Sequence, residues 1–362
     1  MDHKGRRRRL QNLLARHRLD ALLIAHPANV RYLCGFTGST SAIVIDEGGS
    51  VFFTDGRYKE QARVEVQGSR VIVARKAPLT AAAEWLGANA KKRGVKTVGI
   101  EAEHLSVAAR TRLVKALPSP LRLREAPPLV EQARMIKDAE EIDRLRAAVL
   151  LGSGLFNVLL ETIRSGVKEV DVAAELEYAA RRAGADGMSF ETIIASGVRA
   201  ALPHGCASQA VIPANGFVVC DFGVILAGYC SDMTRTVHVG RPKPEMLRMY
   251  EAVLCAQEAA LGVVRAGASV NAVDRASRKV LKNKGLAKYF THSTGHGVGL
   301  EIHEAPRLAA GQDEVLQPGM VITIEPGAYV PSVGGVRIED MVVVTDRGCQ
   351  TLTATRKELI TI

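Results

Sequence analysis

Two aspartates within apolar, strand-like segments constrain this chain more than any other feature. Asp221 lies in Phe217-Val-Val-Cys-Asp-Phe-Gly223, and Asp232 lies in Gly228-Tyr-Cys-Ser-Asp-Met-Thr-Arg-Thr236. A turn at Ala227-Gly228 predicts that the two segments pair as antiparallel strands, so that the carboxylates face each other. Buried carboxylates need a cationic partner, and neither segment supplies an inward lysine. We therefore interpret both as metal ligands; for either residue alone, the alternative is a hydrogen bond to backbone at a strand end.

A second pair of carboxylates lies in two later strand-like segments. Glu325 ends one apolar segment just before a Pro-Gly break, and Glu339 lies among apolar neighbours in Gly335–Val344. Because side chains alternate along a strand, Arg337 shares a face with Glu339. Arg337 is therefore expected either to orient that carboxylate or to bind substrate, and the alternative is a plain ion pair.

Three of the nine histidines fall in one glycine-containing segment, at His292, His296 and His303. Imidazole is the expected nitrogen ligand of a catalytic divalent metal, so the segment is a candidate source of one ligand. Taken singly, each of these histidines is more often structural. His204 stands alone on a loop, in Ala201-Leu-Pro-His-Gly205, and its surroundings by themselves favour a structural role.

Four carboxylates and one imidazole form a donor set that suits two hard divalent ions. Four negative charges balance two dications almost completely, so Mn²⁺ or Co²⁺ is expected, with Zn²⁺ as a further possibility. A metal pair of this kind activates water and polarises a carbonyl group. The donor set therefore predicts metal-assisted hydrolysis of an amide bond.

The length of 362 residues predicts two domains. The first part alternates strand-like runs with helical stretches, which indicates a small α/β domain over residues 1–130. Near Pro127-Pro128 this pattern stops, and Asp138 with Glu141 forms a capping-box pattern at the start of a long amphipathic helix. We therefore expect a second domain over residues 131–362.

The second domain contains a weak internal sequence repeat. Arg164-x-Gly166 is followed by Gly184, and Arg265-x-Gly267 is followed by Gly285 at the same offset. Each second glycine is placed to end a helix in the left-handed conformation. Two related halves would place a site on the pseudo-two-fold axis between them, and the alternative is chance similarity between two helical hairpins.

Much of the formal net charge of +10 lies at the start of the chain, in Lys4 and Arg6 through Arg9. We expect a solvated start to the first helix, with a partner-binding arm as the alternative, and no nucleic-acid partner. Charged residues interrupt the apolar stretch that a secretory signal needs, and no segment is expected to span a membrane. The six cysteines form no Cys-x-x-Cys pair, so we interpret them as buried thiols of a cytoplasmic protein.

These segments together resemble the metallopeptidases of the creatinase and prolidase type. In the first domain, Asn29-Val-Arg-Tyr-Leu-Cys-Gly-Phe36 and Thr54-Asp-Gly-Arg-Tyr58 resemble the creatinase-type amino-terminal domain. The resemblance covers nearly the whole chain. It implies a mixed α/β (α+β) architecture, in which that small domain precedes a pita-bread catalytic domain with an internal pseudo-two-fold repeat.

The resemblance also implies roles for individual residues. The metal ligands fall on Asp221, Asp232, His296, Glu325 and Glu339. Asp232 and Glu339 would bridge the metals, and Glu325 would also shuttle the proton. The remaining histidines would act on the substrate side: His204 and His303 stabilise the tetrahedral intermediate, and His292 takes a further substrate-side position.

The activity that the resemblance implies is cleavage between an N-terminal residue and proline, in dipeptides or short peptides. Arg307 favours a dipeptidase (prolidase), because a guanidinium at this position could clamp the free carboxylate of a Xaa-Pro dipeptide. The alternatives are an aminopeptidase P that acts on longer peptides, a surface role for Arg307 paired with Asp313 or Glu314, and, remotely, a non-catalytic binding module. Members of the group are commonly cytoplasmic homodimers.

Overall fold

Apolar segments in the first third of the chain form one mixed sheet. The computed structural model describes residues 1–362, and the chain divides into two units, Met1–Arg134 and Met135–Ile362. In the first unit the strand order is β4-β3-β2-β1-β5-β6, with β1 antiparallel to β2 and parallel to β5. The strands are β1 (Ala21–Ile24), β2 (Ser41–Asp46), β3 (Gly49–Asp55), β4 (Arg70–Ala74), β5 (Thr97–Glu101) and β6 (Arg122–Ala126).

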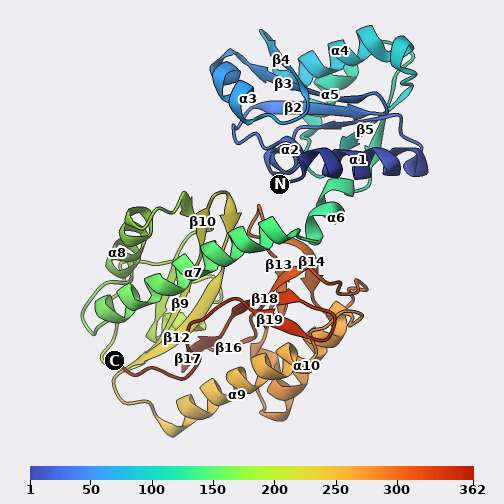
Figure 1. The fold of residues 1–362 in the computed structure, drawn as a ribbon. Coiled ribbons are helices and arrows are strands. Elements are labelled where there is room, and N and C mark those ends of the chain that lie inside the picture. Colours follow the sequence, from blue (N-terminus) through green and yellow to red (C-terminus); the bar gives the residue numbers. More distant parts are fainter. The chain divides into compact units, whose positions relative to one another are not determined.

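Helices cover both faces of this sheet. They are α1 (His3–Leu14), α2 (Pro27–Cys34), α3 (Lys59–Glu65), α4 (Pro78–Arg93) and α5 (Val107–Ala116). Helix α6 (Leu129–Met135) follows them, and the division between the units falls inside it. Alternation along the strands directs Leu23 and Phe53 toward Leu86 of α4 and Leu113 of α5. Figure 1 shows α4 and α5 on one side of the sheet and α1 on the other.

The basic residues at the start of the chain were expected to form a solvated start to the first helix, and the structure differs from this. Lys4, Arg8 and Arg9 of α1 are exposed, but Arg6 and Arg7 are buried. Arg6 donates a hydrogen bond to the carbonyl oxygen of Tyr32 (3.1 Å), and Arg7 donates one to that of Leu33 (2.5 Å). These carbonyls belong to the last turn of α2, whose free oxygens attract cations. The expectation is therefore wrong for these two residues, because they hold α1 against the end of α2.

The second unit contains the later strands in several small sheets. They are β7 (Gly187–Met188), β8 (Ile193–Ser196), β9 (Gly216–Phe222), β10 (Val224–Leu226), β11 (Tyr229–Cys230), β12 (Met233–Val239), β13 (Gly295–Gly297), β14 (Glu304–Leu308), β15 (Val321–Ile324), β16 (Gly327–Val330), β17 (Gly334–Arg337), β18 (Asp340–Val344) and β19 (Cys349–Thr351). The main sheets have the orders β12-β9-β8 and β14-β13-β15-β18-β19, and every pairing within them is antiparallel.

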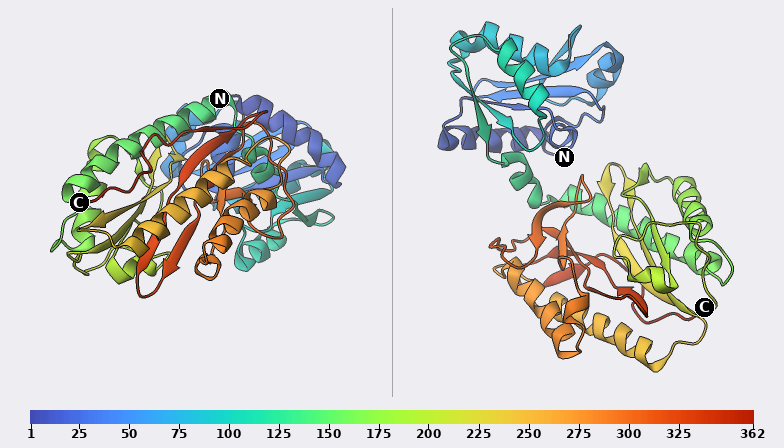
Figure 2. Two further views of the ribbon diagram at one scale, coloured as in Figure 1. Left: turned by 90° about the horizontal axis from the view of Figure 1, so that it is seen from below. Right: turned by 180° about the vertical axis from the view of Figure 1, so that it is seen from behind.

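Two helix pairs flank these strands. They are α7 (Ala139–Thr162) with α8 (Glu169–Arg182), and α9 (Pro244–Leu261) with α10 (Val270–Asn283). Figures 1 and 2 show the strands of the second unit between the two pairs. The predicted capping box is confirmed, because the Glu141 N–H donates to Asp138 and the Asp138 N–H donates to Glu141, each at 3.0 Å.

The internal repeat is confirmed by the backbone. Gly184 follows α8 and Gly285 follows α10, and both have positive φ angles, 96° and 74°. The residue before each helix, Lys168 or Ser269, forms an isolated antiparallel bridge, to Val211 in the first half and to Val315 in the second. Matching helices, glycines and bridges make chance similarity a poor explanation.

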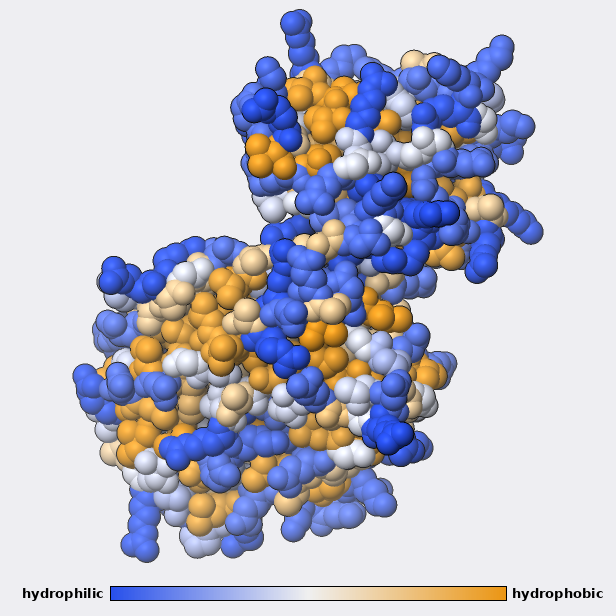
Figure 3. All heavy atoms as spheres, in the orientation of Figure 1, coloured by the Kyte–Doolittle hydropathy of each residue, from blue (hydrophilic) through white to orange (hydrophobic).

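Helix α7 corrects the expectation that no segment is long enough to span a membrane. By length and composition alone, this helix could cross one. Its Phe156 and Leu159 lie in the core of the second unit, whereas Leu150 is 67% exposed. Figure 3 shows that the surface of the second unit on this side mixes apolar and hydrophilic side chains. We therefore interpret α7 as an amphipathic core helix.

The cysteines are free thiols, but burial does not describe all of them. Cys34, Cys220 and Cys230 are buried as expected, and burial raises the pKa of the Cys34 thiol to about 11. Cys206 is only partly buried, and Cys255 is exposed. The expectation of buried thiols is therefore wrong for Cys255, because its side chain lies on the solvent-exposed face of α9.

Candidate metal centre and active site

Strands β9 and β12 bring the two aspartates to one cavity, in a register that differs from the expected one. The strands pair antiparallel as predicted, but Asp221 lies opposite Thr234, and Asp232 lies two residues before Thr234 on the chain. The predicted turn at Ala227-Gly228 is confirmed, with positive φ at both residues, and it joins the short strands β10 and β11 that lie between β9 and β12. Since residues two apart share a face of a strand, both carboxylates still point into the same cavity.

Glu339 and Glu325 approach this cavity from the other half of the unit. Glu339 lies between β17 and β18, where its carboxylate accepts a hydrogen bond from the Thr234 hydroxyl (2.8 Å). Glu325 follows β15, and its N–H donates to the carbonyl oxygen of Thr294 (2.8 Å). The carboxylates of both halves therefore converge between the two sheets.

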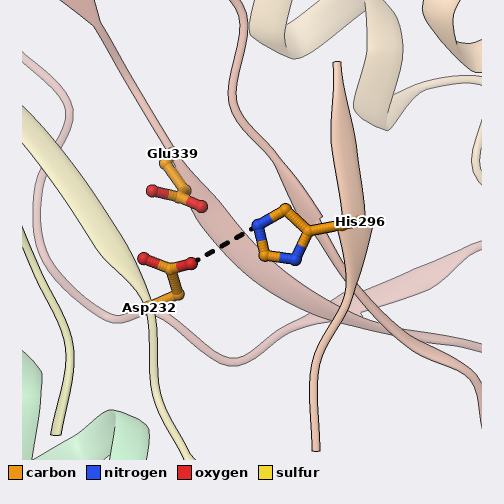
Figure 4. A group of neighbouring side chains, drawn as sticks. All are labelled: Asp232, His296 and Glu339. Carbon is orange, nitrogen blue, oxygen red and sulfur yellow. Dashed lines mark ion pairs between the residues drawn. The ribbon is translucent and has the colours of Figure 1, made fainter. Parts of the chain in front are cut away.

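His296 of β13 completes the cluster. Its Nε2 lies 3.6 Å from an Asp232 oxygen and 3.4 Å from a Glu325 oxygen. Ligand atoms of Asp232, His296 and Glu339 all lie within 4.8 Å of one another. Figure 4 shows the three side chains pointing toward one another. The other ring nitrogen, Nδ1, is 3.0 Å from the carbonyl oxygen of Gly297, so it carries the proton of the neutral ring.

The glycines around His296 allow close packing of backbone. A Cβ at Gly295 would lie 1.9 Å from the carbonyl oxygen of Thr323, and one at Gly297 would lie 2.2 Å from that of Ala305. Their lack of a side chain lets β13 fit between β14 and β15, which fixes the His296 backbone.

The charges of the cluster leave it short of cations. Burial, followed by the neighbouring carboxylates, raises the pKa of Asp232 and of Glu339 well above the usual range. Burial also raises the pKa of Glu325 to about 8 and lowers that of His296 to about 4. A neutral His296 then directs the lone pair of Nε2 toward carboxylate oxygens, which repel it.

Two further observations test whether the residues fit bound metal ions. Oxygen Oδ1 of Asp221 and oxygen Oε1 of Glu339 are buried without any hydrogen-bond partner. Buried oxygens of this kind are rare in proteins unless they have a role such as metal binding. The free oxygens, the facing imidazole lone pair and the excess of carboxylates all fit divalent cations.

Arg337 is the cation closest to the cluster, and it contacts protein groups. Its guanidinium forms an ion pair with Asp221 (2.5 Å) and donates to the Tyr329 hydroxyl, at 2.6 Å, and to the carbonyl oxygen of Pro203, at 3.0 Å. Its Nε–H donates to Thr234 at 3.1 Å. Arg337 therefore orients a carboxylate, but this carboxylate is Asp221 and not the expected Glu339.

The other predicted histidines surround the same cavity. His292 hydrogen-bonds the Tyr329 hydroxyl (2.8 Å), and burial lowers its pKa to about 3. The His303 ring packs edge to face on His296, with centroids 4.5 Å apart. His204 and His303 are exposed at the cavity surface, so both can reach a bound molecule.

Arg307 also lines the cavity. It lies opposite His296 across β13 and β14, and opposed residues of antiparallel strands project from the same face. No ion pair joins Arg307 to Asp313 or Glu314. Its exposed guanidinium is therefore available to a ligand.

The cavity has a volume of about 590 Å³ and gathers every predicted site residue. It also contains residues that the sequence did not single out: Phe190, Glu191, Ile193, Pro203, Cys206, Ser293 and Glu304. Thr234, whose hydroxyl donates to Glu339, was not singled out either. Strand alternation could have identified it, because it lies two residues after Asp232 and so on the same face. The loop residues gave no such signal, because their positions depend on contacts distant in sequence.

Comparisons with known proteins agree with this arrangement. Residues 143–346 match the model of metallopeptidase family M24, and residues 6–136 match the creatinase/prolidase N-terminal domain. The chain is 36% identical over 357 residues to the Xaa-Pro dipeptidase of Pyrococcus furiosus, covering 99% of this chain and 100% of the relative.

Solved structures give the same result. The Xaa-Pro dipeptidase from Bacillus anthracis superposes with a TM-score of 0.96 and 38% identity, covering 100% of each chain. The X-Pro aminopeptidase from Thermotoga maritima gives a TM-score of 0.89 and 35% identity, covering 99% of this chain and 100% of the other. Both family models match, and the solved dipeptidase structure matches this chain over its full length. This chain therefore belongs to the M24 metallopeptidases that carry a creatinase/prolidase N-terminal domain.

Proposed function

We propose that this chain is a dinuclear-metal Xaa-Pro dipeptidase that hydrolyses the bond between an N-terminal residue and proline. One observation supports this most directly: a cavity whose buried carboxylate oxygens lack hydrogen-bond donors and whose neutral imidazole faces other carboxylates. Likeness to Xaa-Pro dipeptidases over the full chain supports the substrate class. An intact donor set disfavours a non-catalytic binding module.

The proposed ligands are the cluster residues of both halves, Asp221, Asp232, His296, Glu325 and Glu339. Mn²⁺ is the proposed ion, with Co²⁺ or Zn²⁺ as alternatives, because most donors are hard oxygens. When bound, a metal pair supplies an activated water and polarises the carbonyl group of the substrate.

The residues of the chain perform the remaining steps. Glu325 takes up a proton and passes it to the leaving amine of proline. His204 and His303, on the exposed side of the cavity, donate hydrogen bonds as negative charge develops on the substrate oxygen. His292 lines the substrate side, where its ring is held by Tyr329, and Arg337 orients Asp221.

Arg307 is the proposed recognition group for a dipeptide. A bidentate pair with the carboxylate of the terminal proline favours a substrate that ends at proline. A longer peptide has no free carboxylate at this position and cannot form the pair. The second candidate function is an aminopeptidase P, which the likeness to the Thermotoga X-Pro aminopeptidase supports. A cytoplasmic homodimer completes the proposal by analogy with the group.

The deciding experiment compares two substrates on one preparation. The protein is stripped of metal, reconstituted in turn with Mn²⁺, Co²⁺ or Zn²⁺, and given a Xaa-Pro dipeptide or a Xaa-Pro tripeptide. A dipeptidase should cleave the first with the higher kcat/KM. Faster cleavage of the tripeptide would support aminopeptidase P, and full activity in protein shown to be metal-free by elemental analysis would exclude the two-metal proposal.

A further inference from the structure

His204 is the histidine of the cavity whose ring the protein holds least. Its imidazole forms no hydrogen bond with another residue, whereas His292 is held by Tyr329 and Ser293, and His303 packs on His296. The position of the His204 side chain therefore depends on the loop that bears it. That loop follows η3 (Gly197–Ala201).

Glu169, the first residue of α8, lies beneath this loop and is fully buried. Its carboxylate accepts hydrogen bonds from the N–H and the hydroxyl of Ser196, both at 2.8 Å. It also accepts the Ser208 hydroxyl at 2.7 Å and pairs with Arg199 at 3.0 Å. Arg199 in turn donates to the carbonyl oxygen of Cys206 at 2.9 Å. Carboxylate and guanidinium together hold both ends of the segment that contains His204.

The other half of the repeat holds its histidine segment in the same way. Asp274 of α10 is buried and pairs with Arg278 at 2.8 Å. Arg278 donates to the carbonyl oxygen of His292 (2.5 Å), and Asp274 accepts the hydroxyl of Thr294 (2.8 Å). In both halves an acid and an arginine hold the carbonyl of one residue and the hydroxyl of the residue two positions later.

We propose that Glu169 is a positioning residue, which sets the place of His204 through the Arg199–Cys206–Ser208 contacts, and that Asp274 does the same for His292. The proposal rests on the proposed function, in which His204 donates to the reacting carbonyl group. Donors of this kind act only within a narrow range of positions, and a misplacement of about 1 Å can cost about 100-fold in rate. Both acids are needed as carboxylates, because the groups that point at them from these segments are donors.

Glu169→Gln tests the proposal with little change in shape. The amide group of glutamine is itself a donor, so it opposes part of the donor set around this position. We expect kcat for the dipeptide to fall by about 10- to 100-fold while KM changes less than about threefold, with metal content equal to that of the unmodified enzyme. Ser208→Ala removes the hydroxyl that donates to Glu169 and accepts from the Ala210 N–H, but leaves the other donors to Glu169 in place, so it should show a smaller loss in the same direction.

A double-mutant cycle identifies the residue through which Glu169 acts. In a His204→Ala background, Glu169→Gln should lower kcat by no more than about twofold further, because the group that it positions is already gone. In a His303→Ala background it should show its full effect. An equal further loss in both backgrounds, loss of metal in Glu169→Gln, or an unchanged kcat would overturn the proposal.

Hydrogen–deuterium exchange gives a measure that does not require activity. Glu169→Gln should speed amide exchange over residues 196–208 and leave residues 290–294 unchanged, and Asp274→Asn should do the reverse. If the unmodified enzyme cleaves no Xaa-Pro peptide, the proposed function fails while this measurement still decides the contact network. Unchanged exchange over 196–208 in Glu169→Gln would overturn the network itself; Ser208→Ala serves as the second variant should Glu169→Gln not fold.

Discussion

Arg307 is an exposed guanidinium on the same face of its strand as His296. If it binds the carboxylate of a terminal proline, Arg307→Ala should raise KM for a Xaa-Pro dipeptide by roughly 10- to 100-fold, the loss of a charge-assisted pair of about 1.5–3 kcal/mol. Steady-state kinetics on a dipeptide and a tripeptide measures the effect, and tripeptide hydrolysis should hardly change.

The matched control is Arg347→Ala, which removes an exposed arginine from the turn between β18 and β19. It should leave both substrates unaffected, and so exclude a general effect of net charge. Equal damage to both substrates by Arg307→Ala would assign that residue to something other than carboxylate recognition.

His204 and His303 are the exposed histidines of the cavity, and neither belongs to the group of close ligand atoms formed by Asp232, His296 and Glu339. Replacing either by alanine should lower kcat by about 10² to 10³ because one donor to the developing charge is lost. Metal content should remain near two ions per chain in the proposed dinuclear enzyme. Elemental analysis and kinetics on the same preparation make the comparison, and a parallel loss of metal would identify the histidine as a ligand instead.

At the scale of elements, the contact between α1 and α2 depends on Arg6 and Arg7, which were expected to be solvated. Arg7→Ala removes the donor to the Leu33 carbonyl oxygen in the last turn of α2. We expect the first unit to lose about 1.5–3 kcal/mol of unfolding free energy. Trp85, the only tryptophan, lies in α4 of this unit, so urea unfolding followed by its fluorescence reports on the unit. Arg8→Ala, on the exposed face, should change the same quantity by less than about 0.5 kcal/mol.

The sequence predicted those elements whose evidence is local. Charged residues within apolar strands, such as Asp221 and Glu339, reveal a site because a buried charge needs a partner. Alternation also placed Arg337 on an inward face. Alternation does not reveal which residue lies across the sheet, so the pairing of Arg337 with Asp221 was not predictable. Glu169 gave no signal either, because a glutamate at a helix start is ordinary and its partners lie far along the chain.

For the whole molecule, bound metal should contribute to stability because it neutralises carboxylates that otherwise repel one another. At a metal concentration 100 times Kd, the expected gain is about 2.7 kcal/mol. Calorimetry with and without Mn²⁺ should show a higher Tm in its presence, and chelation should abolish activity.

Asp232→Asn or Glu339→Ala should remove both this rise in Tm and all activity, and added metal should not restore either. Asp143→Asn, on the exposed face of α7, is the control and should retain both. A Tm that is independent of metal in the unmodified protein would contradict a resident metal centre.

The ion pair between Arg337 and Asp221 joins residues 116 positions apart, one from each half of the repeat. Contacts this distant form late in folding, because a long loop must close before they contribute any free energy. The helices of each half can therefore form while the ligand cluster does not yet exist. During refolding, metal uptake should lag behind the recovery of helical circular dichroism. The rate of metal uptake would then report the rate at which the two halves dock.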